Sequence, residues 1–271
     1  MQAASREALS SVAAGLDKAT KGSSAAVLLD LADELFAVAR VLEGQPALRR
    51  ALADTSTGDA NVQLATALFG GKVSERAASV LESAVRARWS SPREFAAGWE
   101  LLAIQAAFAA AEADDKMDTV EDELFRFGRI VAGRPDLQRA LSDPSATDAQ
   151  RSSLLQALVG GRVHPVTERL LTASLIGSRA RRAEQTVSEL SDLAALRRER
   201  SIALVATPVA LTDEQEQRLT DELSRIYDRR ISLHISLEPE LIGGLVVRVG
   251  DEIIDGSIQS RLSAARQRLA R

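Results

Sequence analysis

The chain has 271 residues, of which 45% are hydrophobic and only 3% aromatic, a globular composition with few rings to stack on single-stranded nucleic acid. Lys and Arg number 34 against 38 Asp and Glu, so the formal charge of −4 provides no global positive field for nucleic acid or an anionic membrane. Cysteine is absent and the two histidines, His164 and His234, are far apart in the sequence, which excludes disulfides, cysteine catalysis and a multi-histidine metal centre.

Helical spacing dominates the first 200 residues, which are rich in alanine and leucine. One apolar stripe repeats at steps of three and four residues: Leu28, Leu31, Leu35, Val38 and Leu42. Glycine and proline separate such stripes, as at residues 44–46, 70–71 and 91–92, and these residues typically end one helix and begin the next. The pattern predicts short and medium helices with tight joints, packed as bundles.

An internal repeat divides this helical region into two copies. The sequence of Asp33–Phe36 recurs at Asp122–Phe125, and 12 of the 22 positions from 33 to 54 are identical at this offset of 89. After small insertions, Gly70-Gly71 matches Gly160-Gly161. We therefore predict two tandem copies of one helical bundle, over residues 1–103 and 104–200. The helix predicted at 92–113 would close the first copy and open the second, which would hold the copies in a fixed relation.

After residue 200 the spacing of the apolar residues changes. Residues 201–271 are predicted to form a small α/β module. We expect a buried strand at 201–206, a helix that begins at the capping box Thr212–Gln215, and a strand at 231–237 with one polar face. Two further strands, 245–249 and 252–254, flank a Gly250-Asp251 hairpin turn. An amphipathic helix with four arginines and no acid would follow from Ser257 to Arg271. The fold class is therefore mainly α, with a βαββ(β)α module at the C-terminal end.

Candidate chemistry is sparse. Gly70-Gly71-Lys72 lacks the spacing and the Ser or Thr of a phosphate-binding loop, so we interpret it as a helix-joining turn. His234 alternates with serines on a polar strand face, and His164 precedes a proline at a helix start. We interpret the first as solvated and the second as a cap. No nucleophile–base pair and no cofactor or metal fingerprint is found.

Local charge clusters allow two interpretations. The acidic runs Asp114-Asp115 and Glu121–Glu123 lack the alternating ligands of a calcium loop, and carboxylates in a first helical turn are favoured by the helix dipole, so we expect a solvated face. The basic runs 179–182 and 197–200 are either solvated helix surface or a docking site for an acidic partner. The longest apolar stretch, Leu101–Ala113, is too short to span a bilayer, and no secretory signal is visible, so we expect an intracellular protein.

A glycine-rich motif in the module carries a resemblance to a known family. Residues 239–258 read PELIGGLVVRVGDEIIDGSI and are followed by Arg261-Leu262. This combination resembles the C-terminal motif of the delta subunit of bacterial F-type ATP synthases, the counterpart of the mitochondrial oligomycin-sensitivity-conferring subunit. Residues 175–182 also resemble the arginine-bearing helix junction of that family. The resemblance covers roughly residues 104–271, and the extra first bundle is similar to the long delta subunits of actinobacteria.

The resemblance implies a non-catalytic subunit of the stator, or peripheral stalk. Its helical domain would bind N-terminal helices of the alpha subunits, and its C-terminal module would bind the C-terminal region of the membrane-anchored b subunit. It would then be one copy in a hetero-oligomeric complex at the cytoplasmic face of the membrane, with no cofactor, no nucleic acid and no membrane insertion of its own.

The motif supplies the candidate site residues. Gly243 and Gly244 would allow a close approach before a strand, Gly250 and Asp251 would turn the hairpin, and Asp255 or Ser257 would cap the last helix. Arginines of that helix would face acidic stretches of the b subunit. The full candidate set is Pro239, Ile242, Gly243, Gly244, Gly250, Asp251, Asp255, Gly256, Ser257, Arg261, Arg266 and Arg268. Fold maintenance and partner docking both remain open for these residues. Two other functions also remain open: a generic helical adaptor, and a small-ligand enzyme with its site in the C-terminal module.

Overall fold

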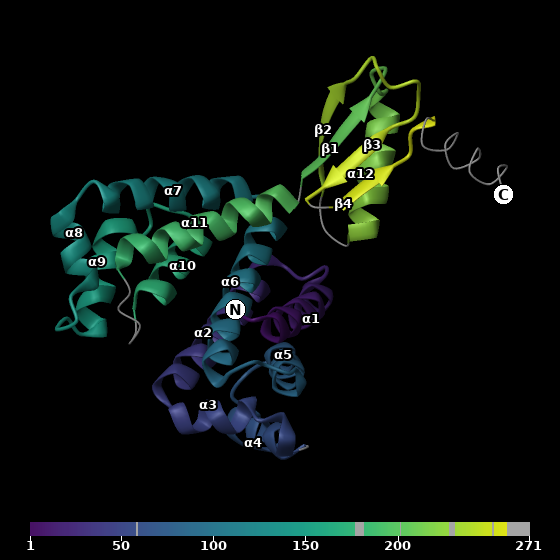
Figure 1. The fold of residues 1–271 in the computed structure, drawn as a ribbon. Helices are drawn as coiled ribbons and strands as arrows, with labels where there is room; N and C mark the ends of the chain where they lie inside the picture. The colour runs from purple at the N-terminus through teal and green to yellow at the C-terminus, as the bar shows by residue number, and fades with distance from the viewer. Residues whose placement is uncertain (58, 177–181, 201, 228–230, 251, 259–271) are drawn as a thin grey trace. The chain divides into compact units, whose positions relative to one another are not determined.

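The fold, seen here in a computed structural model, is mainly helical with one small sheet near the C-terminal end (Figure 1), which confirms the predicted fold class. The structure describes residues 1–57, 59–176, 182–200, 202–227, 231–250 and 252–258. Contacts divide the chain into two compact units, Met1–Ala194 and Ala195–Arg271. Each unit has its own hydrophobic core.

The first bundle begins with the long helices α1 (Ala3–Thr20) and α2 (Ala25–Gly44). The short α3 (Pro46–Ala53), a 3-10 turn (Thr55–Thr57), α4 (Ala60–Phe69) and α5 (Glu75–Arg86) follow. The predicted apolar stripe lies on α2, and all five of its side chains are buried. Gly70 and Gly71 join α4 to α5, as predicted, and Gly71 adopts a left-handed φ of 71° that glycine tolerates without steric cost.

Helix α6 (Pro92–Ala113) is the long helix that the sequence predicts at the end of the first copy. It begins with a capped N-terminus, because the Ser91 side chain accepts a hydrogen bond from the backbone N–H of Glu94, and proline occupies its first turn. Trp99 and Phe95 are fully buried and meet edge to face, with ring centroids 6.3 Å apart. The helix packs against α1, α2 and α3 of the first bundle and against α7 and α10 of the second.

The second bundle repeats the succession of elements found in the first. It comprises α7 (Met117–Ala132), α8 (Pro135–Ser142), α9 (Asp148–Val159), α10 (Pro165–Leu175) and α11 (Ala183–Arg200). These helices correspond in order to α2, α3, α4, α5 and α6 of the first bundle. Helix α6 thus ends one bundle and also takes the place of an α1 at the start of the next.

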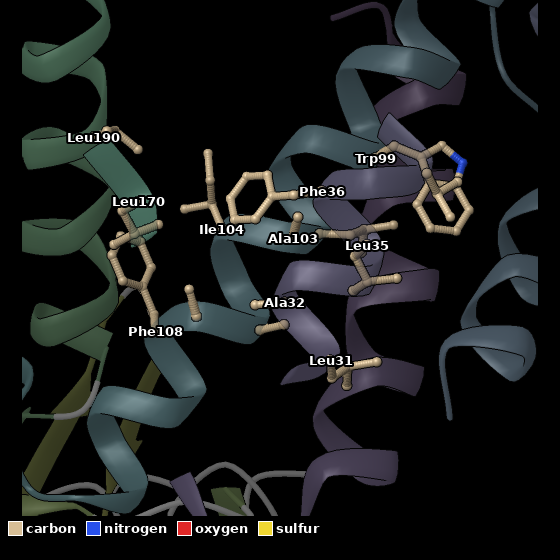
Figure 2. Close-up of a cluster of buried hydrophobic side chains, with 14 of the residues drawn as sticks. Leu31, Ala32, Leu35, Phe36, Trp99, Ala103, Ile104, Phe108, Leu170 and Leu190 are labelled. Atoms are coloured by element: carbon tan, nitrogen blue, oxygen red, sulfur yellow. The ribbon is translucent and has the colours of Figure 1, made fainter. Parts of the chain in front are cut away.

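One continuous hydrophobic core runs through both bundles, from Ala8 to Ala194. Figure 2 shows part of it: Phe36 and Ile104 lie between Leu35 of the first bundle and Leu170 and Leu190 of the second. Because the two copies share one core as well as one helix, they belong to a single compact unit. The predicted boundary at residue 103 falls in the middle of α6.

The C-terminal unit is a four-stranded mixed sheet with one described helix. Its elements are β1 (Ile202–Thr207), α12 (Asp213–Tyr227), β2 (Ser232–Leu237), β3 (Val246–Val249) and β4 (Glu252–Asp255). The strand order is β2-β1-β3-β4, with β1 parallel to β2 and the other pairs antiparallel. The predicted capping box starts α12: the backbone N–H of Thr212 donates to Gln215 Oε1 at 2.9 Å and the Gln215 N–H donates to Thr212 Oγ1 at 3.3 Å.

Helix α12 covers one face of this sheet. Leu223 packs with buried residues of β1 and β3: Ala203, Val205, Val247 and Val249. The alternation predicted for β2 is only partly right, because Leu237 is 58% exposed while Leu233 and Ile235 pack against the core. Leu237 is the last residue of an edge strand. The helix predicted from Ser257 to Arg271 lies outside the described residues from residue 259 on.

Candidate docking surfaces

The two halves of the glycine-rich motif pack against each other in the C-terminal unit. The Gly244 φ is +83°, and a Cβ added there would lie 2.5 Å from the Gly256 carbonyl oxygen. A Cβ added to Gly243, whose φ is +155°, would lie 2.6 Å from Cδ1 of Ile258. Gly244 is thus required by backbone angle and by space, whereas Gly243 is favoured by its backbone angle, because the end of the exposed Ile258 side chain can shift. The two glycines let the segment before β3 approach the segment after β4.

Backbone hydrogen bonds join the segment before β3 to the segment after β4. The Gly256 N–H donates to the Leu245 carbonyl at 2.9 Å, and the Ile258 N–H donates to the Gly243 carbonyl at 2.9 Å. Asp255 Oδ1 accepts from the Ser257 N–H at 2.9 Å in a local Asp turn, and Ser257 is 4% exposed. Between these segments, β3 and β4 form the predicted hairpin, with Gly250 at a left-handed φ of 57°.

The motif residues therefore divide into two groups. Gly243, Gly244, Gly256 and Ser257 form the junction just described, whereas Ile242 beside it is 70% exposed and Pro239 is also exposed. Asp251, Arg261, Arg266 and Arg268 are outside the described residues. A large aliphatic side chain held outward by a rigid glycine junction is an apolar contact point on the surface.

The sheet face opposite α12 is a second exposed apolar surface. The strand registers place His234, Leu204, Arg248 and Ile253 in one row across all four strands. All four are exposed, and Leu204 and Ile253 are 49% and 57% exposed. His234 is solvated, as predicted, but it lies on a face that combines apolar side chains with two basic side-chain types.

Apolar grooves are found among the described residues of the helical unit. One of about 370 Å³ runs between α4 and α5 and is lined mainly by Val62, Ala65, Phe69, Val73, Ala78 and Leu81. Another, of about 230 Å³, is bordered by α6, α10 and α11, with Leu101, Ile104, Leu190 and Leu193 in its walls. Grooves of this type can receive the apolar face of a partner helix.

The contact between the two bundles combines an aromatic anchor with an ion pair. Phe36 of α2 is 4% exposed and lies in a small cavity shared with Ala173, Ser174 and Ile176 at the end of α10. Beside it, Arg169 Nη1 lies 3.0 Å from Asp33 Oδ2. Burial raises the pKa of Asp33 above its usual range even though the Arg169 charge lowers it, so desolvation outweighs this ion pair.

Two glutamates brace the bundles, and the sequence analysis did not identify them as such. Glu123 was assigned to a solvated acidic face, but its carboxylate accepts from the His164 N–H at 2.9 Å and from the Thr167 hydroxyl at 2.5 Å, across from α7 to α10. Glu34, the counterpart of Glu123, accepts from the Ser74 N–H at 3.1 Å, which is the equivalent bond, and also from the Ser74 hydroxyl at 2.7 Å. The matched glutamates in the repeat were the signal that would have found them.

The remaining sequence candidates are structural. His164 caps α10, because its Nδ1 accepts from the Val166 N–H at 3.3 Å. Asp114 and Asp115 lie after the C-terminus of α6 and not in a first helical turn, which corrects that prediction. No group of three or more His, Asp or Glu within the described part of the chain is arranged to hold a metal ion. None of the helices described is long and apolar enough to cross a membrane.

These observations define a helical scaffold with an appended α/β module and with apolar surfaces suited to docking. Residues 104–269 match the sequence model of the family described as ATP synthase delta (OSCP) subunit. The chain belongs to this family, whose members are components of the ATP synthase peripheral stalk. The match begins at the second bundle, as the resemblance in the sequence predicts.

Full-length relatives extend the similarity to the first bundle. The chain is 44% identical to the ATP synthase subunit delta of Streptomyces avermitilis over 268 residues, 98% of both chains. It is 42% identical to that of Nocardia farcinica over 271 residues, 100% of both chains. Among solved structures, it aligns with a chain of the Toxoplasma gondii mitochondrial ATP synthase hexamer at 16% identity and a TM-score of 0.33, covering 62% of this chain and 95% of the other.

Proposed function

We propose that the chain is a non-catalytic brace of the stator that links the catalytic head of an F-type ATP synthase to its membrane-anchored b subunit. The full-length similarity to subunits delta of ATP synthases carries this proposal. In the proposed arrangement the helical unit binds N-terminal helices of the alpha subunits. The C-terminal unit binds the C-terminal region of the b subunit. One copy would be held in this way at the cytoplasmic face of the membrane.

The architecture of the helical unit supports such a role. A stator must resist torque, which requires stiffness and slow release from its partners rather than bond chemistry. Helix α6 is shared by both bundles and one core runs through them, so a load applied to one bundle is transmitted to the other through packed side chains. The grooves along α4–α5 and beside α6 offer sites for amphipathic partner helices.

The C-terminal unit offers a different kind of contact for the b subunit. Its glycine junction holds Ile242 outward, and the open sheet face presents Leu204 and Ile253 beside Arg248. We assign Gly243, Gly244, Gly256 and Ser257 to maintenance of this junction, and Ile242 and Arg248 to partner contact. Two separate contacts on one chain bind more tightly together than either alone, because the second forms as an intramolecular event.

The proposal is tested by removing the protein from cells and then adding it back to their membranes. Membranes from cells that lack the protein should retain proton flow but lose coupled ATP synthesis, and added full-length protein should restore it. Leu204→Glu should reduce recovery of the b subunit in pull-downs without loss of the alpha subunit, since Leu204 is 49% exposed and its replacement leaves the core intact. Full coupled synthesis without the chain would contradict the proposal.

A further inference from the structure

The face of α7 that includes Phe125 is the counterpart of a face that is covered in the first bundle. Phe125 corresponds to Phe36 in the repeat, yet Phe36 is 4% exposed and Phe125 is 56% exposed. The helices that carry them, α2 and α7, bury the same positions toward their own bundles: Leu35 and Leu124 are both fully buried. The difference therefore lies in what covers the outer side of each helix.

In the first bundle the end of α10 contributes to this cover, together with α6, whose Ala96 and Glu100 line the same small cavity as Phe36. The end of α10 places Ala173, Ser174 and Ile176 beside Phe36, and it places Arg169, one turn earlier, 3.0 Å from Asp33. This is a short, well-defined recognition pattern: small and aliphatic side chains against an aromatic ring, with a basic residue one helical turn away.

The second bundle retains the receptor side of this pattern. Asp122, Phe125 and Arg129 on α7 match Asp33, Phe36 and Arg40 on α2 residue for residue. Two further positions are smaller on α7: Gly128 stands where α2 has Ala39, and Ala132 stands where it has Glu43. Among the described residues of the helical unit, no helix follows α11 to cover this face in the way that α10 covers α2. Asp122 forms an ion pair with Arg126 of its own helix, at 2.8 Å, instead of with a neighbouring helix.

We propose that the α7 face formed by Asp122, Phe125 and Arg129 binds a helix of another protein subunit, in the way that the end of α10 binds the matching face of α2. The expected partner segment is helical, presents Ala, Ser or Ile-sized side chains to Phe125 and carries a Lys or Arg one turn away for Asp122. The interface inside this chain supplies the template for that chemistry. The partner is a helix of another protein, whatever the role of that protein, so the inference does not depend on the stator assignment.

The experiment uses photo-crosslinking from the full-length protein in cells. The photoreactive analogue p-benzoylphenylalanine replaces Phe125 in one variant and Ile130 in a matched control. Ile130 also lies on α7 and is 52% exposed, but its counterpart Val41 is 38% exposed and not covered at the bundle contact. We expect a crosslink at position 125, absent at position 130, to a helical segment of another subunit with the stated side chains.

Substitutions then test the contact with the partner that crosslinking identifies. Phe125→Glu should lower recovery of that partner at least about tenfold, as expected when an aromatic anchor is removed, whereas Phe125→Leu should retain most of it. Ile130→Glu should leave recovery unchanged, and all three variants should melt like the unmodified protein because both positions are exposed. Equal crosslinking at 125 and 130, or a crosslink only to residues 195–271 or to a second copy of this chain, would overturn the inference. If the chain is recovered with ATP synthase but position 125 yields no specific crosslink, the inference fails while the stator assignment stands.

Discussion

Some internal hydrogen bonds recur at matching positions of the two bundles. Asp54 Oδ1 accepts from the Ser56 N–H and hydroxyl at 2.9 and 2.6 Å, and Asp143 does the same with Ser145 at 2.8 and 2.7 Å. The matched glutamates Glu34 and Glu123 also both accept from a backbone N–H at matching positions, those of Ser74 and His164. The duplicated sequence therefore specifies local turns and helix-to-helix braces twice, independently of which copy they occur in.

The outer faces of the bundles differ despite this identity. Phe36 and Phe125 occupy the same place in the same four-residue sequence, but only Phe36 is buried. A residue's burial on an outer face depends on whichever element comes to cover it, and the end of α10 lies beside Phe36. Comparison of the copies thus separates what the repeat encodes locally from what the assembly of the two copies adds.

The largest expected effect is a difference in stability between substitutions of the two matched phenylalanines, Phe36 and Phe125. Phe36→Ala should destabilise the helical unit by about 3–5 kcal/mol, because it removes a buried aromatic ring and leaves a cavity at the contact between bundles. Phe125→Ala should change the free energy of unfolding by less than about 0.5 kcal/mol, since its ring is more than half exposed. Urea denaturation followed by circular dichroism measures both.

A pair of core leucines provides the control for that measurement. Leu35→Ala and Leu124→Ala should each cost about 2–5 kcal/mol, because both side chains are fully buried inside their own bundles. Similar costs for Phe36→Ala and Phe125→Ala would mean that the copies do not differ at this face.

The next effect concerns the glutamate braces. Glu123→Ala should cost about 1–3 kcal/mol, since its carboxylate accepts hydrogen bonds from His164 and from the fully buried Thr167. Glu34→Ala should cost less, because its bonds to Ser74 are exposed to solvent. A double-mutant cycle with Glu123→Ala and Thr167→Val, both measured by urea denaturation, isolates the carboxylate–hydroxyl bond. A coupling energy near zero would show that this bond does not contribute.

Much of the fold could be predicted because its signals are local. The stripe from Leu28 to Leu42, the capping box at Thr212 and the turn at Gly70-Gly71 each depend on residues within a few positions of one another. The repeat added a check on the turn, which recurs at Gly160-Gly161, since a turn specified twice is less often a coincidence. The family resemblance rested on a similarly short stretch of sequence.

The unpredicted features all join residues far apart in the chain. Glu123 bonds to residues 41 and 44 positions away, and Phe36 is buried by the end of α10. The Gly244 requirement comes from the Gly256 carbonyl oxygen, on the far side of the hairpin. Periodicity and spacing do not report which distant element will cover a given face, so these roles followed only from the folded chain.

A smaller effect should be equal in both copies. Gly71 and Gly161 adopt left-handed φ angles of 71° and 63°, and a Cβ added to either would meet nothing within 4 Å. Each substitution to Ala should therefore cost about 1 kcal/mol from backbone strain alone, without a clash. Thermal melts of Gly71→Ala, Gly161→Ala and the double variant should show equal and additive shifts. Unequal shifts would indicate that the two joints are not equivalent.

The smallest effect is a matched pH dependence at the aspartate turns. Hydrogen bonds from the serine hydroxyl and N–H lower the pKa of Asp54 and of Asp143 below the usual value in the folded state. A group with a lowered folded pKa stabilises the fold above its unfolded pKa, near 4, and this contribution disappears as the pH falls through the folded pKa. Asp54→Asn and Asp143→Asn should therefore each make the loss of stability between pH 4 and lower pH slightly less steep, by equal amounts.

The serine partners test the cause of that pH dependence. Ser56→Ala removes the larger cause of the Asp54 shift, the side-chain hydrogen bond, and leaves the backbone one. It should therefore reproduce most of the effect of Asp54→Asn, and the two substitutions together should add little to Asp54→Asn alone, because both act on one hydrogen-bonded pair. Urea midpoints measured from neutral to acid pH give the comparison. Full additivity would mean that Ser56 acts on stability by a route other than the Asp54 carboxylate, and the same series at Asp143 and Ser145 would then show whether the second copy shares that route.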